Sequence, residues 1–343
     1  MLLKKLLAFY IFFCCTSAVF SQTATVDSNS IINTVTDAVI KKTNEQQYNI
    51  DNGKSFVYPK PKAFGFISNL PKDGAGIAIA PFKRKNLSPL LLVAGSTALL
   101  SMVDESVAQG VHQFSKNIHL QPGEQYKDIL NIKSGKTNVS LLKAPQNINT
   151  ALYQMGQGFP SLLIGAGLFT FGKIHNDYRA ISTASQLAES FILMGVGTQV
   201  LKRITGRQSP SEAVNLDGAW NPLPSFKNYQ THTPFYDAFP SGHLATLMST
   251  VTVLLENYPE KKWIKPVGYS LMGMVGYAMI NADEHWVSDY PLAIALGYLC
   301  AKQVAKNNRK TVQSFTGNRH KATLSYTINY VNRCVMPGVI YKF

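Results

Sequence analysis

The sequence predicts an all-helical bundle, because apolar runs of helical length alternate with polar segments along the 343-residue chain. These runs contain many glycines and alanines, which allow helices to pack closely against one another. Most of them are about 15 to 18 residues long, near the lower limit for crossing a bilayer of roughly 30 Å. A bundle partly embedded in a membrane and a soluble exported bundle both fit this pattern, and the first is favoured. The six runs cover residues 89–103, 159–174, 180–201, 243–255, 264–280 and 290–304.

Residues 1–21 have the composition of a secretory signal rather than of a folded segment. Lys4 and Lys5 precede an apolar stretch, and small residues follow near Ser21, before a cleavage site expected at Gln22. The protein is therefore expected to be exported, to the periplasm or to a membrane of the cell envelope.

The rest of the chain divides into three predicted parts. Residues 22–88 are polar and contain turn signals, which predicts an N-terminal extension that packs loosely and has a short helix at 31–40. Residues 89–310 form the helical domain, in which the polar stretch 104–149 is expected to be a connecting excursion outside the core. Residues 311–343 include two segments of alternating polarity, which predict a small C-terminal β-hairpin.

The composition favours an anionic partner. Lysine and arginine total 33 against 19 aspartates and glutamates, which gives a formal net charge of +14. A basic exported protein suits anionic membrane surfaces and phosphorylated substrates, although a solvated basic surface by itself explains most of the excess. Nucleic acid is not an expected partner, because the lysines are scattered and no aromatic-basic recognition motif is present.

Removal of the signal leaves two of the four cysteines, Cys300 and Cys334. Two isolated cysteines are too few for a disulfide framework. They form either one bond in an oxidising compartment or two buried thiols, and the sequence leaves both options open.

Three polar clusters stand at the ends of apolar runs, and they carry the chemistry that this chain offers. Packing the runs together would gather two cations, two imidazoles and one carboxylate around a single cavity. Lysine and arginine hold the oxygens of an anion, and backbone N–H groups at a helix start bind phosphate. One histidine can then attack phosphorus while the other protonates the leaving oxygen. The clusters are Lys202 with Arg207, Pro240-Ser241-Gly242-His243, and His285 with Asp289.

The spacing within these clusters supports that interpretation. His285 and Asp289 are four residues apart and share one helix face, so the carboxylate can hold the imidazole in one tautomer. Ser241 is expected to cap the next helix, and Gly242 leaves room for an anion to reach the first-turn N–H groups. His243 lies in that first turn, where the helix N-terminus lowers its pKa and a bound phosphate raises it again.

Lys202 and Arg207 follow a helix C-terminus, where cations are electrostatically favoured in any case. Their functional interpretation is a clamp on the phosphoryl oxygens. Asp283 and Glu284 stand just before the third cluster and are expected to point away from a phosphate. No metal and no cofactor are expected, because no familiar metal-ligand spacing is present.

On these motifs the sequence resembles the type 2 phosphatidic acid phosphatase (PAP2) and haloperoxidase superfamily, over roughly residues 159–306. The resemblance implies a PAP2-type six-helix bundle and a phosphomonoesterase that needs no metal. It also implies that His285 is the nucleophile, Asp289 its orienting partner and His243 the general acid. The stretches that carry it are Lys202-Arg203-Ile204-Thr205-Gly206-Arg207-Gln208-Ser209-Pro210, Phe239-Pro240-Ser241-Gly242-His243 and His285-Trp286-Val287-Ser288-Asp289.

Two arginines that the family pattern expects are absent. This chain has Ser209 where one of them stands, and Met279 where the other stands, six residues before the nucleophile. Loss of one charge-assisted contact to a transition-state anion costs roughly 3–4 kcal/mol. Arg207 and Arg203 are expected to fill part of the vacancy.

Three functions remain open on these grounds. The favoured one is a phosphatase that acts on a lipid phosphate through a phosphohistidine. Ser209 and Met279 favour a weak or inactive relative that binds phosphorylated lipid or a protein partner. A vanadate-dependent haloperoxidase is least favoured, because the missing arginines are those that hold vanadate. The aromatic loop 211–237 either covers the pocket or packs onto the bundle.

Overall fold

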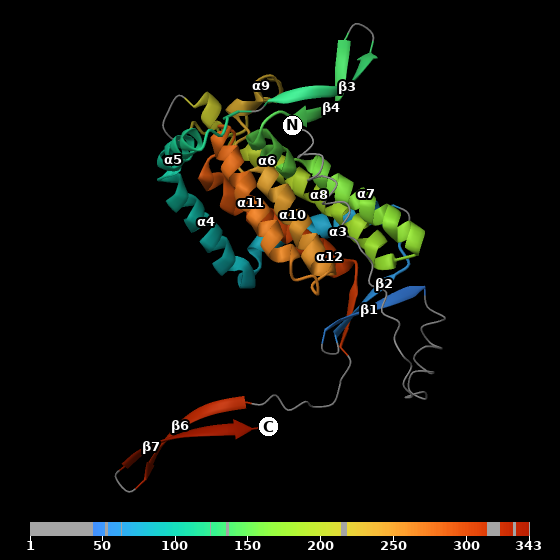
Figure 1. The fold of residues 1–343 in the computed structure, drawn as a ribbon, viewed down its shortest axis with the longest axis vertical. Helices are drawn as coiled ribbons and strands as arrows, with labels where there is room; N and C mark the ends of the chain where they lie inside the picture. Colours follow the sequence, from blue (N-terminus) through green and yellow to red (C-terminus); the bar gives the residue numbers. More distant parts are fainter. Residues whose placement is uncertain are drawn as a thin grey trace. The chain divides into compact units, whose positions relative to one another are not determined.

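The structure is a computed structural model that describes residues 44–51, 54–62, 64–123, 125–134, 137–213, 218–313, 323–331 and 334–342 (Figure 1). The chain divides at Asn44, and the helices and strands belong to the unit Glu45–Phe343. The predicted signal at 1–21 and the short helix predicted at 31–40 lie outside the described residues.

All six predicted helices are present, so the all-helical fold class is confirmed. α10 contacts four of the other five, α7, α8, α11 and α12, and nearly every residue of its first three turns is buried. A largely apolar helix buried on most of its faces is the expected centre of a bundle. The six helices are α4 (Leu87–Ser101), α7 (Gly158–His175), α8 (Tyr178–Thr205), α10 (Gly242–Asn257), α11 (Ile264–Asn281) and α12 (Tyr290–Asn307).

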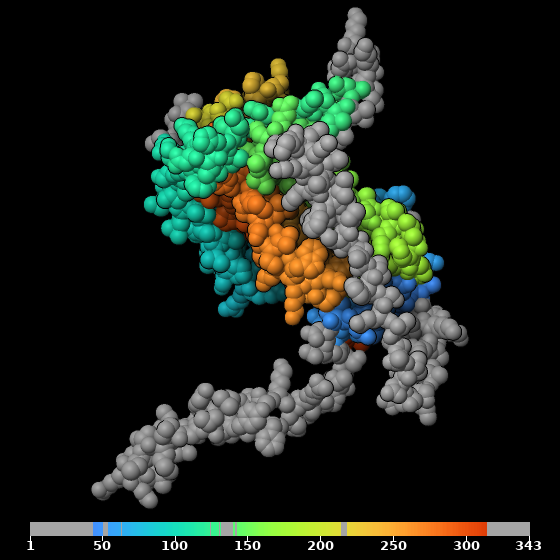
Figure 2. Space-filling model, viewed as in Figure 1, coloured from blue at the N-terminus to red at the C-terminus, as the bar shows by residue number. Residues whose placement is uncertain are grey.

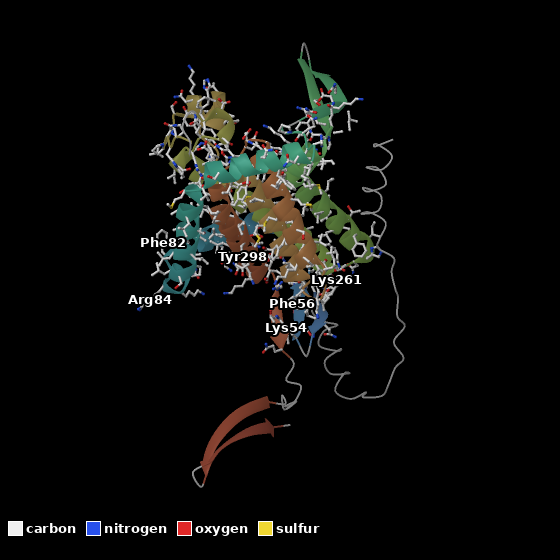
Figure 3. The ribbon with its side chains drawn as sticks, turned by 60° about the vertical axis from the view of Figure 1, so that its left-hand side comes forward. Lys54, Phe56, Phe82, Arg84, Lys261 and Tyr298 are labelled. Carbon is white, nitrogen blue, oxygen red and sulfur yellow. The ribbon has the colours of Figure 1, made fainter. Side chains whose placement is uncertain are left out.

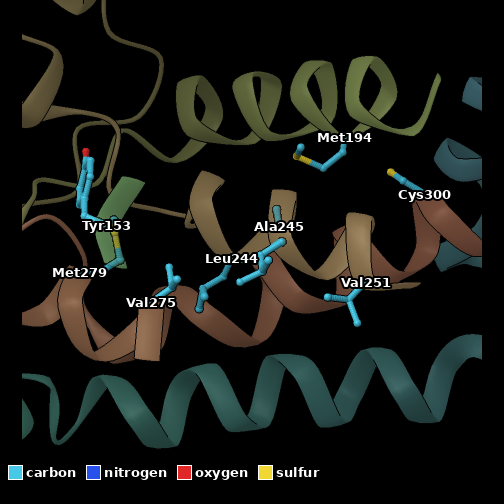
Figure 4. Packing of buried hydrophobic residues seen from close by; sticks show 10 residues of the cluster. Tyr153, Met194, Leu244, Ala245, Val251, Val275, Met279 and Cys300 are labelled. Atoms are coloured by element: carbon cyan, nitrogen blue, oxygen red, sulfur yellow. The ribbon is translucent and has the colours of Figure 1, made fainter. Parts of the chain in front are cut away.

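The core forms where α10 meets its neighbours (Figure 4). Leu244 and Val251 of α10 pack with Val275 of α11 and Met194 of α8. α12 approaches most closely at Gly297, where an added Cβ would lie only 2.3 Å from the carbonyl oxygen of Ala245. A side chain at that position would force the two helix backbones apart, so glycine is required there.

The segment before α4 is better packed than expected. It contains β1 (Glu45–Asp51), β2 (Lys54–Pro59) and α3 (Gly65–Ile79), and β2 also pairs with β5 (Lys310–Gln313) in a three-stranded antiparallel sheet. Phe56 and Tyr58 of β2 are buried, and α3 packs against α8 and α12. The expectation of a loosely packed extension is therefore wrong for β2, whose apolar side chains are buried, whereas Phe64 and Ile67 next to it are exposed.

The polar stretch 104–149 is also partly inside the core, contrary to the prediction. It forms α5 (Asp104–Asn117), the β3–β4 hairpin (Tyr126–Ser134 and Thr137–Pro145) and the start of α6 (Ile148–Gly156). Asp104, Ser115 and Asn149 are buried and hydrogen-bonded. Buried polar groups with partners give no hydrophobic signal in a sequence, which explains why this segment was expected to lie outside.

The predicted C-terminal hairpin is present as β6 (Thr323–Val331) and β7 (Cys334–Lys342), paired antiparallel along their whole length. Cys300 is a buried free thiol of α12, and burial raises its pKa to about 12. The side chain of Cys334 lies outside the described part of the chain.

Within the described ranges, no single helix has both the length and the apolar composition needed to cross a membrane. One pair, Arg84–Ser101 followed by Asp104–Asn117 and bent by 65°, meets both requirements when taken together. α4 has no buried residue, and apolar side chains such as Leu92 are exposed along it. Phe82 and Arg84, just before α4, also lie on the outside (Figure 3).

A carboxyl pair is buried where α3, α8 and α12 meet. Asp73 and Glu189 are fully buried, and one oxygen of each accepts a hydrogen bond from a carboxamide of Asn307 or Asn308. The other two oxygens have no donor. Burial and the neighbouring Asp73 raise the pKa of Glu189 to about 8. The raised pKa favours the protonated form of Glu189 at neutral pH.

Replacement of Glu189 with glutamine is expected to stabilise the protein at pH 8 by about 1–3 kcal/mol and to change it little at pH 5. The folded-state pKa lies above the unfolded value, so the wild type loses stability as pH rises from about 4.5 to 8. Glutamine keeps the shape and has no proton to lose. Urea unfolding at both pH values measures the effect, with exposed Glu212→Gln as the control. Equal pH slopes for the wild type and Glu189→Gln would contradict it.

Candidate active site

The structure brings the second and third clusters together at one end of the bundle. The ring centroids of His243 and His285 are 6.1 Å apart, with the rings edge to face at 68°. Ser241 N–H donates to the Asp289 carbonyl at 3.2 Å, which fixes the start of α10 to the short helix η5 (Val287–Asp289). α5 and the aromatic loop before α10 lie at this same end (Figure 2). Segments that are more than 40 residues apart in sequence therefore form one site.

His285 is a buried imidazole beside a carboxylate. Its side chain is 5% exposed, and its Nδ1 lies 3.5 Å from Oδ2 of Asp289. Burial, and then the positive charge of Lys202, lower the pKa of His285 to about 3, against opposing effects of Asp237 and the Ala238 carbonyl. At neutral pH the ring therefore carries one proton and keeps one nitrogen lone pair free for chemistry.

Asp289 is held on both of its oxygens. Oδ2 accepts the backbone N–H of Trp286 at 2.8 Å, and Oδ1 accepts Nη1 of Arg207 at 2.5 Å. Complete burial raises the pKa of Asp289, and the contact with Arg207 opposes that shift. The guanidinium therefore favours the carboxylate form, which is the form that can orient His285.

Arg207 is placed differently from the expected clamp on phosphoryl oxygens. Its guanidinium is 1% exposed and donates to Asp104, Ser288 and Asp289. It also lies over the rings of Trp220 and Trp286, at 4.9 Å and 5.5 Å from their centroids. All of these contacts of the guanidinium are with side chains of the protein itself.

Arg203, the other arginine expected to compensate, is also engaged elsewhere. It donates to Gln199 at 2.9 Å and lies 4.2 Å from the centroid of the Tyr229 ring. Ser209 and Met279, which replace the family arginines, are buried, and Met279 belongs to the apolar core. The structure thus gives the phosphate position fewer arginines than the family pattern does.

Lys202, at the end of α8, lies close enough to both imidazoles to act on them electrostatically. Its charge lowers the pKa of His243 and that of His285. Its Nζ donates to Asp237 at 3.1 Å and would lie 4.0 Å from a Cβ added at Gly242. Gly242 therefore leaves open the space between the ammonium group and the start of α10.

The start of α10 has the geometry predicted from its sequence. Ser241 is the N-cap, and its hydroxyl accepts Leu244 N–H at 3.5 Å. The first N–H groups of a helix have no intrahelical acceptor, and together with the helix dipole they attract an anion. The ammonium of Lys202 lies near this helix start, 4.0 Å from a Cβ added at Gly242, so both could attract the same anion.

His243 is half-buried, and two residues of α6 that sequence reasoning missed pack against it. The ring of Tyr153 lies 4.5 Å from the His243 ring, and a Cβ at Gly156 would come within 3.0 Å of the His243 Cβ. Burial, and then the charges of His285 and Lys202, lower the pKa of His243 to about 3. The Asn147-Ile148-Asn149 stretch could have indicated α6, because Asn147 caps it by accepting Thr150 N–H.

The aromatic loop packs onto the bundle only in part, because Tyr229 lies against Arg203 of α8 while Phe226 is exposed. Tyr229 is buried and stacks on Tyr236, and the half-exposed Trp220 packs against Phe239. Asp283 forms an ion pair with His112 at 3.2 Å. Among the described residues, no group of three or more histidines, cysteines or acids could hold a metal ion.

An apolar cavity of about 410 Å³ lies between α3, α7 and α8. Its walls include Phe66, Leu162 and Phe191, and neither imidazole lines it. We therefore do not assign this cavity to the reaction site.

Comparisons with known proteins relate part of this chain to one family. The family whose sequence model matches is the PAP2 superfamily, over residues 183–311, which include all three clusters. One similar solved structure is LpxE from Aquifex aeolicus, with 23% identity, a TM-score of 0.35 and coverage of 46% of this chain and 83% of its own. Another is a transmembrane PAP2 type phosphatidylglycerolphosphate phosphatase from Bacillus subtilis, with 16% identity, a TM-score of 0.34 and coverage of 71% and 96%. Among curated proteins, none matches the chain.

Proposed function

We propose that this chain, whose residues 183–311 match the PAP2 superfamily, is a phosphatase that hydrolyses a phosphomonoester through a phosphohistidine on His285. The observation that carries the proposal is the pair of imidazoles, 6.1 Å apart, with Lys202 beside both. Two imidazoles close to one cation can supply a nucleophile and an acid to the same phosphoryl group.

In the first step, Nε2 of His285 attacks phosphorus and the bond from phosphorus to the leaving oxygen breaks. His243 gives its proton to that oxygen, so the product leaves as an alcohol. Asp289 stabilises the positive charge that develops on the attacking ring. In the second step, neutral His243 takes a proton from water, and the resulting oxygen attacks phosphorus to release phosphate and free His285.

The protonation states suit this sequence if the substrate brings a proton. His285 needs a lone pair, and its lowered pKa keeps it neutral. His243 needs a proton, and in the free protein its pKa is about 3. A phosphate anion beside the ring raises that pKa, so a bound phosphomonoester monoanion can pass its proton to His243.

Lys202 and the first turn of α10 would hold the phosphoryl oxygens. Because the two arginines of the family pattern are missing, the ammonium of Lys202 has to neutralise a larger part of the anion's charge. Replacement of Lys202 with methionine is therefore expected to lower kcat/KM about 10²- to 10³-fold. Steady-state assays test this, with exposed Lys227→Met as the control. A variant with unchanged kcat/KM would remove Lys202 from the site.

We propose a lipid phosphate as the substrate and a membrane of the cell envelope as the location. The proposal is supported by the apolar side chains exposed on α4 and by three basic residues, Lys83, Arg84 and Lys85, just before it. Exposed apolar area next to clustered positive charge suits an anionic membrane surface.

The test of the proposed function is release of inorganic phosphate in chelator-treated buffer. A diacylglycerol phosphate in detergent and a water-soluble alkyl phosphate serve as the two substrates. Release that vanadate inhibits supports the phosphatase, and a preference for the lipid supports the substrate class. Buried Ser209 and Met279 favour the alternative of a binding protein. Binding of lipid phosphate without release from either substrate would select it, and halide oxidation after vanadate is added would select a haloperoxidase.

A further inference from the structure

Asp104, the first residue of α5, is buried in the site although it lies outside the segment that matches the family. Its Oδ1 accepts the backbone N–H of Ser288 at 2.9 Å, and its Oδ2 accepts the Ser288 hydroxyl at 2.5 Å. The same Oδ2 accepts Nη2 of Arg207 at 2.7 Å. One carboxylate therefore binds both the residue before Asp289 and the arginine that holds Asp289.

The hydrogen bonds around Arg207 run in one consistent direction. Its Nη1 donates to the Ser288 hydroxyl oxygen at 2.7 Å and to Asp289 at 2.5 Å. The Ser288 hydroxyl in turn donates its own proton to Asp104. Each of these groups is at most 1% exposed, so water does not compete for the bonds.

We propose that Asp104 and Arg207 are positioning residues that, through Ser288, fix the Asp289 carboxylate against His285. The inference rests on the proposed function and names a part of the reaction site outside the three sequence motifs. It also reassigns Arg207, because a guanidinium held between two carboxylates is suited to orienting Asp289 rather than to binding substrate.

The charged and titratable groups around Asp289 come from four different parts of the fold. Asp104 belongs to α5, Arg207 follows α8, His285 precedes η5, and Tyr290 opens α12. Arg207 lowers the pKa of Asp289 and Asp104 raises it. Removal of the Asp104 charge should therefore lower that pKa, while it also releases one end of the guanidinium.

The first experiment compares Asp104→Asn with Glu105→Gln, the next residue of the same helix turn, which contacts Gln109 instead. For Asp104→Asn we expect kcat to fall about 10- to 100-fold and KM to stay within about twofold. The acid-side fall of kcat/KM should move to lower pH. Ser288→Ala should lower kcat in the same direction, and the double variant should lose less than the product of the two single losses. Activity of Asp104→Asn equal to that of Glu105→Gln would overturn the proposal.

The second experiment does not depend on turnover, so it separates this proposal from the proposed function. Nitrogen-15 NMR of labelled histidine reports the tautomer of His285, with its signal assigned by loss in His285→Gln. We expect the Nδ1–H tautomer in the wild type and a mixture of tautomers in Asp104→Asn. A protein that releases no phosphate but shows this change would keep the positioning role and lose the enzyme. An unchanged tautomer in a folded Asp104→Asn protein would overturn the role whatever the activity.

Discussion

His285→Ala is expected to lower phosphate release by at least about 10³-fold, because it removes the atom that forms the covalent intermediate. The other imidazole cannot replace it without moving, since His243 stays packed against Tyr153, at 4.5 Å between ring centroids, and against Gly156 of α6. The loss should appear in kcat and kcat/KM together, with little change in substrate binding, because Lys202 and α10 remain in place.

Trapping of the intermediate measures the same step directly. Acid-sensitive, base-stable radiolabel from a labelled substrate should remain on the wild-type protein after a base quench and be absent from His285→Ala. His175→Ala on α7 provides the control. His175 is exposed, and among the described residues its ring contacts Phe171 of the same helix. Label that persists in His285→Ala would assign the nucleophile to another residue.

The parts of the fold that sequence predicts well are those in which local rules and burial agree. The six main helices were predictable because each is an apolar run with its own end signals, such as the Ser241 cap of α10 and Gly206 after α8. Gly206 has a φ of 56°, and an added Cβ would clash with the backbone at Asn221. Such helix-end positions depend on a few neighbouring residues, so they can be recognised from the sequence.

Only the site residues that lie within the three sequence motifs could be predicted. The meeting of His243, His285 and Lys202 follows from packing the predicted helices. Asp104 gave no signal, because a single acid in a polar stretch is typical of a surface helix. Its burial depends on Arg207 and Ser288, which are 103 and 184 residues away in sequence. No local pattern records a partnership at that separation.

Arg207 shows the same limit of prediction from sequence, because its position was predicted and its partners were not. Sequence placed it correctly near the site, since it follows the helix that ends at Thr205. It could not decide between substrate and protein as its partner. That choice depends on Asp104 and on Trp220, which stands across an isolated β-bridge from Arg207. The charge of a residue is visible in a sequence, whereas the direction of its side chain is not.

His243→Gln is expected to lower kcat/KM, which reports the first step alone, about 10²- to 10⁴-fold for an alkyl phosphate and much less for p-nitrophenyl phosphate. An alkoxide needs a proton in order to leave, whereas p-nitrophenolate leaves readily without one. Glutamine keeps much of the side-chain volume beside Tyr153 and Gly156, so the comparison isolates the proton. A loss of equal size for both substrates would mean that His243 binds or orients substrate instead of donating a proton.

The pH dependence provides an independent argument for the same role. Burial lowers the pKa of His243 to about 3, so at neutral pH the free protein lacks the acid it needs. The proton must then arrive with the substrate, and kcat/KM for an alkyl phosphate should fall above about pH 6, where the monoanion loses its proton. With p-nitrophenyl phosphate as substrate, kcat/KM of His243→Gln should no longer fall above about pH 6, because p-nitrophenolate leaves without a proton. A wild-type profile that stays flat to pH 8 would contradict the sequence of proton transfers and place a different acid beside the leaving oxygen.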